Sequence, residues 1–513
     1  MKHIPEIRVE HNIPTLYVND APYLALAGEI HNSSASSLEY MEERVWNSVA
    51  GLNLNTLIVP IYWELVEEIE GIYDFTLLDG IIRQAGERDM HLIFLWFGLW
   101  KNSESMYVPR WMKLDTETYF RVRKASGEKI DTISPFCAAA VEKDAAAFSQ
   151  VMAHIRETDS DASTVIAMQI ENEIGLLGTE CDYCEEAKKV FEEEIPEAMK
   201  NEYSVSGNWK CAFGDHAEEY FMAYYFSAAV EKISSAGKKE YPLPFYTNAW
   251  LKQHPWYPGS YPSGGPVKDV HRIWKKMAPS LFTLAPDIYV PYAIDIMEEY
   301  HYEGNPLMIP EARKDAVSAS YCLYAFMEHH AIGYSPFGIE DLGLPPELVM
   351  KPTKEVMAAL NINPIMFETD GGKEYLSKVY GLIENIKPLY FQYRGSNHMQ
   401  SYIKKCETDL GTFLRFGEYD IVVDYFPSAQ GMPVSTGVIF ELEPHKFLIA
   451  GMMSRLEFRV KPGEDKKVRG LKLEDGTIVK GEWLPCHHQN GDEQMQFNLG
   501  PSPTCICAEL YKY

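Results

Sequence analysis

Residues 165–175 read VIAMQIENEIG. The first part is a continuous apolar run, which is typical of a β-strand that helices cover on both faces. The run leads directly into two carboxylates, Glu171 and Glu173, which flank the amide Asn172. In a parallel α/β barrel, polar residues that follow a strand lie at its carboxyl end, where active sites are built. The stretch therefore predicts a parallel strand that carries chemistry at its end.

Seven similar runs lie on either side of this one, separated by longer amphipathic stretches of helical period. They are YLALAGE (23–29), LNTLIVP (54–60), HLIFLW (91–96), PFYTN (244–248), PDIYVP (286–291), PLMIP (306–310) and AIGYSPF (331–337). Eight strand–helix units in about 340 residues favour a (β/α)₈ TIM barrel over an open doubly wound sheet. No Gly-x-Gly-x-x-Gly follows the first run, which also argues against a dinucleotide-binding sheet.

The pattern changes near Gly395, after a helical stretch predicted at 373–393. Beyond it, short alternating runs are separated by turn sequences such as KPGEDKK and LEDGT, the pattern of antiparallel strands. We therefore expect a catalytic (β/α)₈ barrel with flanking helices over residues 1–395. Residues 396–513 are expected to form a C-terminal antiparallel β-sandwich.

The charge and the cysteine content limit the kinds of binding partner and the cellular compartment that we expect. The chain has 47 basic and 74 acidic residues and a formal charge of −27, which would repel nucleic acid and anionic membrane surfaces. Charged residues interrupt the N-terminus where a secretion signal needs an apolar stretch, so we expect a cytoplasmic protein. The chain has nine cysteines. Because this number is odd and no export signal is evident, we expect free thiols and not a framework of disulfides. A homo-oligomer is left open.

The chemistry indicated by these runs needs a second carboxylate. Glu311 supplies it, because it follows the seventh run directly as Met308-Ile309-Pro310-Glu311. The fourth and seventh strands lie on opposite sides of an eight-stranded barrel, so Glu173 and Glu311 could face each other across its mouth. Cleavage of a glycosidic bond requires a carboxylic acid and a carboxylate about 5 to 5.5 Å apart in retaining enzymes, or about 6.5 to 9.5 Å apart in inverting ones.

Several motifs in order resemble glycoside hydrolase family 35, the β-galactosidase family of the retaining barrel clan. They are Ala27 to His31, Gly51 to Thr56 with Val59-Pro60, Gly71 to Phe75 with Asp79, and Gln169 to Gly175. The resemblance implies a retaining, exo-acting hydrolase of terminal β-linked sugars, most of all β-galactosides, with no cofactor. It also implies that Glu173 is the acid/base, that Asn172 binds the sugar 2-hydroxyl and that Glu311 is the nucleophile.

Further residues at strand ends are candidates for substrate binding. Glu29 belongs to the first motif, and Lys101 and Asn102 follow the third run. The family carries a galactose-binding carboxylate after its third strand, and Asn102 or Glu104 takes its place here. Four aromatic residues could stack on sugar faces, with core packing as the alternative for each: Trp96, Trp250, Tyr289 and Tyr334.

Three other functions remain open at this point. A transglycosylase would pass a galactosyl or glucosyl unit to an acceptor sugar, and a non-catalytic protein would bind a carbohydrate without cleaving it. A metal-dependent hydrolase would need a cluster of His and Asp at strand ends, but His329 and His330 are expected to be solvated at a helix end. Cys181-x-x-Cys184 is only half a zinc site, and we expect no metal.

Overall fold

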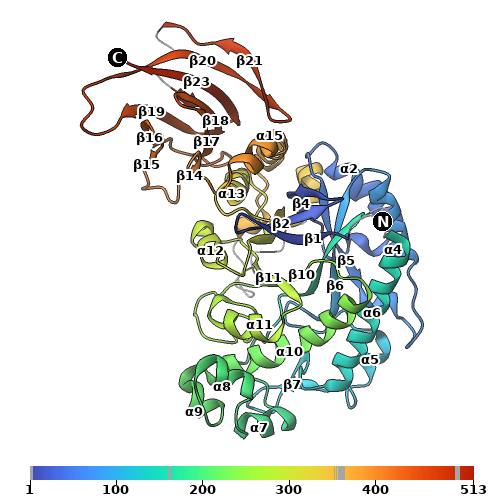
Figure 1. The fold of residues 1–513 in the computed structure, drawn as a ribbon. Helices are drawn as coiled ribbons and strands as arrows, with labels where there is room; N and C mark the ends of the chain where they lie inside the picture. Colours follow the sequence, from blue (N-terminus) through green and yellow to red (C-terminus); the bar gives the residue numbers. More distant parts are fainter. Residues whose placement is uncertain are drawn as a thin grey trace.

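A computed structural model describes residues 4–159, 163–349, 351, 353, 355, 357, 364–491 and 497–513. Its centre is an eight-stranded sheet hydrogen-bonded in the order β11-β10-β9-β6-β5-β4-β13-β12, with parallel neighbours (Figure 1). The strands are β4 (Ala25–Glu29), β5 (Thr56–Tyr62), β6 (His91–Lys101), β9 (Val165–Asn172), β10 (Phe245–Ala249), β11 (Leu281–Pro286), β12 (Met308–Ala312) and β13 (Gly333–Pro336).

The sheet closes on itself between β11 and β12. The Ile288 N–H donates to the Glu311 carbonyl at 2.8 Å, and Ile288 forms a parallel bridge with Ala312. Part of this seam is made by a side chain, since Asn305 accepts from the Leu284 N–H at 2.9 Å and donates to the Leu284 carbonyl at 3.1 Å. The predicted (β/α)₈ barrel is thereby confirmed.

Helices surround the barrel and make its strands inaccessible from outside, so that every residue of β5 and of β9 is buried. The main ones are α4 (Thr76–Gly86), α6 (Ala138–Asp159), α10 (Ala217–Glu240), α11 (His271–Met277), α12 (Ala293–Tyr300), α13 (Ala316–Met327) and α15 (Gly372–Tyr393). Shorter helices are α1 (Leu38–Tyr40), α2 (Trp46–Val49), α3 (Trp63–Val66), α5 (Arg110–Leu114), α7 (Glu185–Glu192), α8 (Glu197–Tyr203) and α9 (Trp209–Phe213).

One predicted strand was wrong. The sixth barrel strand is Leu281–Pro286, whereas the sequence favoured 286–291. The paired residues run from Leu281 to Pro286 opposite β10, and the chain then leaves the ladder towards the barrel mouth. The segment 286–291 is apolar because Ile288 and Val290 pack onto the core, as part of a loop. The other seven predicted strands overlap the observed ones, and the predicted helix at 373–393 corresponds to α15.

The C-terminal part is an antiparallel β-sandwich, as predicted. Its six-stranded sheet contains β14 (Met399–Ile403), β17 (Thr436–Glu443), β18 (Lys446–Met452), β23 (Thr504–Lys512), β20 (Val468–Val479) and β21 (Glu482–His488). Its four-stranded sheet contains β15 (Gly411–Arg415), β16 (Tyr419–Tyr425), β19 (Ser454–Val460) and β22 (Phe497–Leu499). Between the sheets lies a separate apolar core that includes Ile421, Ile439 and Leu456.

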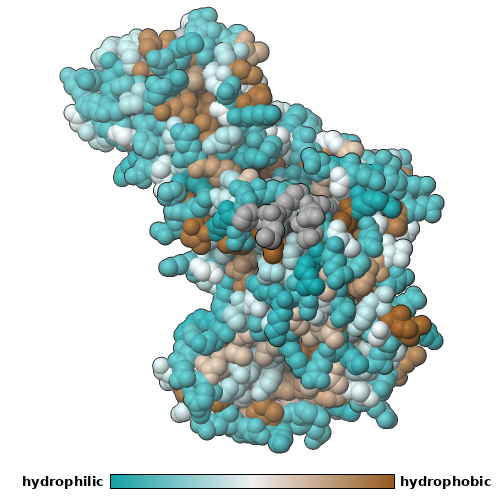
Figure 2. Space-filling view, turned by 45° about the vertical axis from the view of Figure 1, so that its right-hand side comes forward, coloured by the Kyte–Doolittle hydropathy of each residue, from teal (hydrophilic) through white to brown (hydrophobic). Residues whose placement is uncertain are grey.

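The outer face of the six-stranded sheet is buried as well, which explains the continuous apolar run of β17. Val438 and Phe440 alternate with Ile439 and belong to the same core as residues of α13 and α15. These two helices lie between the sandwich and the barrel (Figure 1). The face of the molecule seen in Figure 2 is mostly hydrophilic, with apolar residues gathered on the sandwich.

Two small antiparallel units were not expected from the sequence. One joins β1 (Glu6–Glu10), β2 (Ile13–Val18) and β3 (Ala21–Tyr23), and the other pairs β7 (Arg121–Arg123) with β8 (Lys129–Ile133). All nine cysteines lie within the described ranges and are free thiols. No helix in the described part of the chain has the length and apolarity needed to cross a membrane.

Candidate active site

Three carboxylates meet at the carboxyl end of the barrel strands. Glu173 follows β9, Asp287 follows β11 and Glu311 lies on β12. One side-chain oxygen from each lies within 4.8 Å of the others, and all three residues are buried, at 7%, 3% and 5% exposure. The barrel therefore brings the predicted pair together and adds a third acid, Asp287.

Asp287 was missed because the run 286–291 was interpreted as a strand. In a strand, Asp287 would have been an internal position with no special chemistry. With β11 ending at Pro286, it is the first residue after a strand, the same position relative to its strand that drew attention to Glu173. The signal in the sequence was therefore the carboxylate directly after LFTLAP, residues 281–286.

Glu311 is surrounded by hydrogen-bond donors. The Tyr289 hydroxyl donates to its Oε2 at 2.6 Å, while the side-chain amides of Asn172 and Asn248 donate to its Oε1 at 3.1 and 3.4 Å. A carboxylate that accepts several hydrogen bonds is stabilised in its charged form. This environment suits a nucleophilic anion.

Glu173 has the opposite environment. Burial and then the nearby charge of Glu311 raise its pKa to about 8, against smaller lowerings by the Lys101 cation and by a hydrogen bond with the Asp287 side chain. Its backbone N–H donates to Asn248 Oδ1 at 2.8 Å, and its φ of 47° lies in the left-handed region. A carboxyl with this pKa carries a proton at neutral pH, so it can act as an acid.

Lys101 sets the orientation of the Asn172 amide. Its ammonium donates to Asn172 Oδ1 at 2.8 Å, and because lysine only donates, the amide oxygen must face it. The amide nitrogen therefore faces Glu311. Asn102 is close by, since its N–H donates to the Asn172 carbonyl at 3.1 Å, whereas Glu104 is exposed. Asn102 and Glu104 were the two candidates for the place of the family's carboxylate after the third strand. The structure favours Asn102.

Glu29 lies at the end of β4 with its whole side chain buried. Neither of its carboxyl oxygens has a hydrogen-bond partner in the described residues. Burial, followed by the charge of Glu311, raises its pKa well above the usual range. A buried carboxyl without partners is costly unless another polar group satisfies it, so Glu29 is available to a polar ligand.

Glu171, the first glutamate of the quoted stretch, has a structural role. Its Oε1 and Oε2 accept from the Leu99 and Trp100 N–H groups at 3.0 and 2.7 Å. Asp144 of α6 also accepts from Leu99 N–H, at 2.9 Å, and hydrogen-bonds Glu171. A Cβ at Gly98 would lie 2.5 Å from the Asp144 carboxylate and 2.6 Å from that of Glu171, so only glycine fits there.

The four aromatic candidates divide into two groups. Tyr289 contacts Glu311 as described, and Trp250 is half-buried after β10 with its indole N–H donating to Gln253 Oε1 at 3.2 Å. Trp96 is fully buried and donates to Asp144 Oδ1 at 2.7 Å, on the α6 side of β6. Tyr334 is buried on the side of α13, with its hydroxyl 2.9 Å from that of Ser318. The expectation that Trp96 and Tyr334 contact a substrate is therefore wrong, because both side chains point towards the helices.

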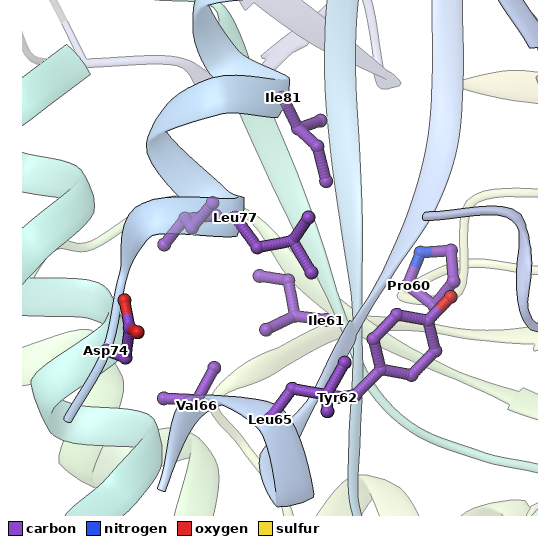
Figure 3. A pocket seen from close by; sticks show the side chains of 9 residues that line it. Pro60, Ile61, Tyr62, Leu65, Val66, Asp74, Leu77 and Ile81 are labelled. Carbon is purple, nitrogen blue, oxygen red and sulfur yellow. The ribbon is translucent and has the colours of Figure 1, made fainter. Parts of the chain in front are cut away.

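Among the cavities formed by the described residues, two lie beside the barrel. One of about 860 Å³ lies beside the ends of β4 and β13. Its polar lining includes His31, Ser34, Glu340 and Asp341, and Glu340 accepts from the His31 N–H and the Ser34 hydroxyl at 2.9 and 2.7 Å. The other, of about 20 Å³, is apolar and lies between β5 and helices α3 and α4 (Figure 3). None of the three clustered carboxylates lines either cavity.

The residues considered for metal binding lie elsewhere or have other partners. Cys184 caps α7 by accepting from the Ala187 N–H at 3.4 Å, and Cys181 is buried beside the Asp182 carbonyl. His329 is buried, with its Nδ1 3.2 Å from His301 Nδ1, so the expectation that it is solvated was wrong. Within the described ranges, the cluster with the spacing of a cation site is the trio Glu173, Asp287 and Glu311.

Comparison with known families matches two separate parts of the chain. The family model of glycosyl hydrolases family 35 matches residues 15–253. A domain of unknown function, DUF5597, matches residues 376–499. A search of curated proteins found no match.

Solved structures that this chain matches include three β-galactosidases. That of Bacillus circulans sp. alkalophilus is 11% identical, with 98% of this chain and 100% of that one covered and a TM-score of 0.48. That of Rahnella sp. R3 is 11% identical, with coverages of 95% and 98% and a TM-score of 0.48. For that of the psychrophilic Marinomonas ef1 the identity is 10%, the TM-score 0.43 and the coverage 67% of this chain, which spans only 61% of that one.

Proposed function

We propose, from the match of residues 15–253 to the model of glycosyl hydrolases family 35, that this chain is a retaining, exo-acting hydrolase of terminal β-linked sugars. β-Galactosides are the leading substrates in this proposal. The observation that carries it is the meeting of Glu173 and Glu311, whose nearest oxygens lie within 4.8 Å. This separation supports retention, because an inverting pair leaves about 6.5 to 9.5 Å for a water molecule.

In the first step, Glu311 attacks the anomeric carbon as Glu173 protonates the glycosidic oxygen. The bond from the anomeric carbon to the leaving group breaks, and a bond to the Glu311 carboxylate forms. The donors Tyr289, Asn172 and Asn248 hold Glu311 in place for the attack. Because the leaving group departs as a neutral alcohol, the step suits sugars with poor leaving groups.

In the second step, Glu173 takes a proton from water, and the resulting hydroxide attacks the anomeric carbon. The bond to Glu311 breaks and the sugar leaves with its original stereochemistry. The pKa of Glu173 supports both roles, since the charge of Glu311 is one cause that raises it. When Glu311 is esterified this charge is gone, so the pKa of Glu173 falls and its carboxylate can act as a base.

For recognition of the sugar, we propose the polar groups around this pair. Asn172 lies between Lys101 and Glu311 and is the proposed partner of the 2-hydroxyl. Glu29 has two buried oxygens without partners, and Asn102 has a buried side-chain oxygen without one, so these groups are the proposed acceptors for other hydroxyls. Trp250, half-buried beyond β10, is the proposed stacking residue.

The test uses the purified full chain and a panel of nitrophenyl β-glycosides. Glu311→Gly should abolish release of nitrophenol, and azide or formate should restore part of it by replacing the nucleophile. Glu173→Ala should lower turnover by at least ~100-fold for poor leaving groups and much less for dinitrophenyl glycosides.

Three results would count against the proposal. Sugar binding without release of nitrophenol would favour a non-catalytic protein. Products that carry an acceptor sugar in place of water would favour a transglycosylase. Retention of full activity in both variants would contradict the roles of Glu173 and Glu311.

A further inference from the structure

We propose that Asp287 is the proton partner of Glu173, so that these two carboxyl groups share one proton while Glu311 carries a full negative charge. Asp287 acts through Glu173 and is therefore a positioning residue for the proton that Glu173 delivers. The inference rests on the proposed function, because it concerns the acid/base of that reaction.

The three carboxyl groups lie too close together for all of them to be ionised. Oxygens of Glu173, Asp287 and Glu311 lie within 4.8 Å of one another in a buried site. Like charges at this distance in a poorly solvated site cannot all persist, so at least one group holds a proton. Asn248 ties the three together, since it accepts from the Glu173 N–H and donates to Asp287 Oδ2 at 2.8 Å and to Glu311 Oε1.

The hydrogen-bond donors decide where the proton lies. Glu311 accepts hydrogen bonds from Tyr289, Asn172 and Asn248, and these three donors stabilise its charged form. Asp287 accepts only from Asn248, through Oδ2, and its Oδ1 is buried without a hydrogen-bond partner in the described residues. A buried carboxyl oxygen without a donor favours protonation, and Glu173 is the neighbouring acid with which Asp287 interacts. The proton therefore belongs to Glu173 and Asp287.

The other titratable groups that face the pair do not replace this proton. Glu29 adds a further acid from β4, and Lys101 supplies a positive charge from β6 that acts on Glu173. Burial raises the pKa of Tyr246, Tyr289 and Tyr300 well above their usual range, so these neighbours of Asp287 stay neutral.

The single proton shared by Glu173 and Asp287 is enough for both steps of the reaction. Before cleavage the pair carries one negative charge and Glu311 another. After cleavage the proton is on the leaving group, the pair carries two negative charges and Glu311 is a neutral ester. Water then returns a proton to the pair and Glu311 regains its charge. The second carboxylate makes the pair a stronger base for this last step, because losing the shared proton creates two adjacent anions.

The test compares Asp287→Asn with the wild-type enzyme in the pH dependence of kcat/KM, with p-nitrophenyl β-galactoside as the probe. Asparagine has nearly the same shape but carries no charge, so loss of the proton from Glu173 no longer creates a second anion. The alkaline limb should move to lower pH by about one unit or more, with the activity at lower pH much less affected. Asp295→Asn, which removes an exposed carboxylate on α12, is the matched control and should leave the profile unchanged.

An unmoved alkaline limb in Asp287→Asn would overturn the inference, and so would a limb that moves to higher pH. Asp287→Ser serves as a second variant if the asparagine variant does not fold, as judged by thermal unfolding, and should shift the limb in the same direction. Loss of wild-type activity on treatment with EDTA, with an unmoved limb in the variant, would overturn it in favour of a cation held by the three carboxylates.

Glu173→Ala is measured in parallel to separate this inference from the proposed function. If Glu173→Ala keeps full activity towards poor leaving groups, the proposed function itself fails. If Glu173→Ala is impaired and Asp287→Asn keeps the wild-type profile, only the role of Asp287 fails.

Discussion

The side-chain amide of Asn172 donates to Glu311 Oε1 at 3.1 Å, and this bond links β9 to β12 across the mouth of the barrel. The same amide accepts from Lys101 at 2.8 Å, so strands β6, β9 and β12 are joined by two consecutive hydrogen bonds. Their order, from cation through amide to carboxylate, holds the amide in one orientation. Perturbing any one of the three should therefore affect the other two.

Replacing Lys101 tests this chain of contacts. Lys101→Met removes the cation that lowers the pKa of Glu173, so the alkaline limb of the pH profile should move above pH 8. It also frees the Asn172 amide to turn, so turnover should fall by about tenfold or more. Steady-state kinetics from pH 5 to pH 10 measure both effects. A limb that moves to lower pH would contradict the assignment of Lys101.

Tyr289 should contribute to turnover through its hydrogen bond to Glu311. Tyr289→Phe removes a donor 2.6 Å from Oε2 of a charged group, which corresponds to about 10- to 100-fold in kcat. KM should change little. Tyr292→Phe, at a tyrosine that is 40% exposed, is the matched control and should behave as wild type. An equal effect of both variants would show that the hydrogen bond has no special role.

Glu29 should govern which sugars are accepted. Glu29→Gln keeps the size of the side chain but changes one acceptor oxygen into a donor, in a site where both oxygens lack partners. The ratio of kcat/KM between galactoside and glucoside should change by about tenfold or more. The nitrophenyl panel provides the measurement. A uniform decrease for every sugar would assign Glu29 to the fold instead of to recognition.

The pair of Asp144 and Glu171 should make stability depend on pH. Burial raises the pKa of Asp144 to about 6, so its protonated form is favoured in the folded state. Its contribution is complete below the unfolded pKa, about 4, and is lost as pH rises through about 6. Urea unfolding should therefore show wild-type stability falling between pH 4 and pH 7, on the order of a few kcal/mol from this group.

Asp144→Asn should flatten that pH dependence, since asparagine does not titrate and keeps an oxygen that can still accept from Trp96. Asp144→Ala, which leaves Glu171 without its partner and Trp96 without its acceptor, should be less stable at every pH. The same slope in wild type and Asp144→Asn would exclude Asp144 as the cause.

The sequence by itself determined seven of the eight barrel strands and two of the three clustered carboxylates. An apolar run long enough for a buried strand is a local property, as is a glutamate placed directly after it, so Glu173 and Glu311 could be found without a structure. The change near Gly395 from a helical period to the alternation of β-strands is equally local, and it predicted the sandwich. The one displaced strand, at 286–291, also concealed Asp287.

Tertiary structure alone decided which side chains share the site. In a strand that is apolar on both faces, nothing distinguishes the residues that face the barrel interior from those that face the helices, so Trp96 and Tyr334 were placed on the wrong side. Asn248 hydrogen-bonds the Glu173 backbone and the carboxylates of Asp287 and Glu311, but nothing in the sequence pointed to it. Its partners lie 39 to 75 positions away along the chain, and only closure of the barrel brings them within hydrogen-bonding distance.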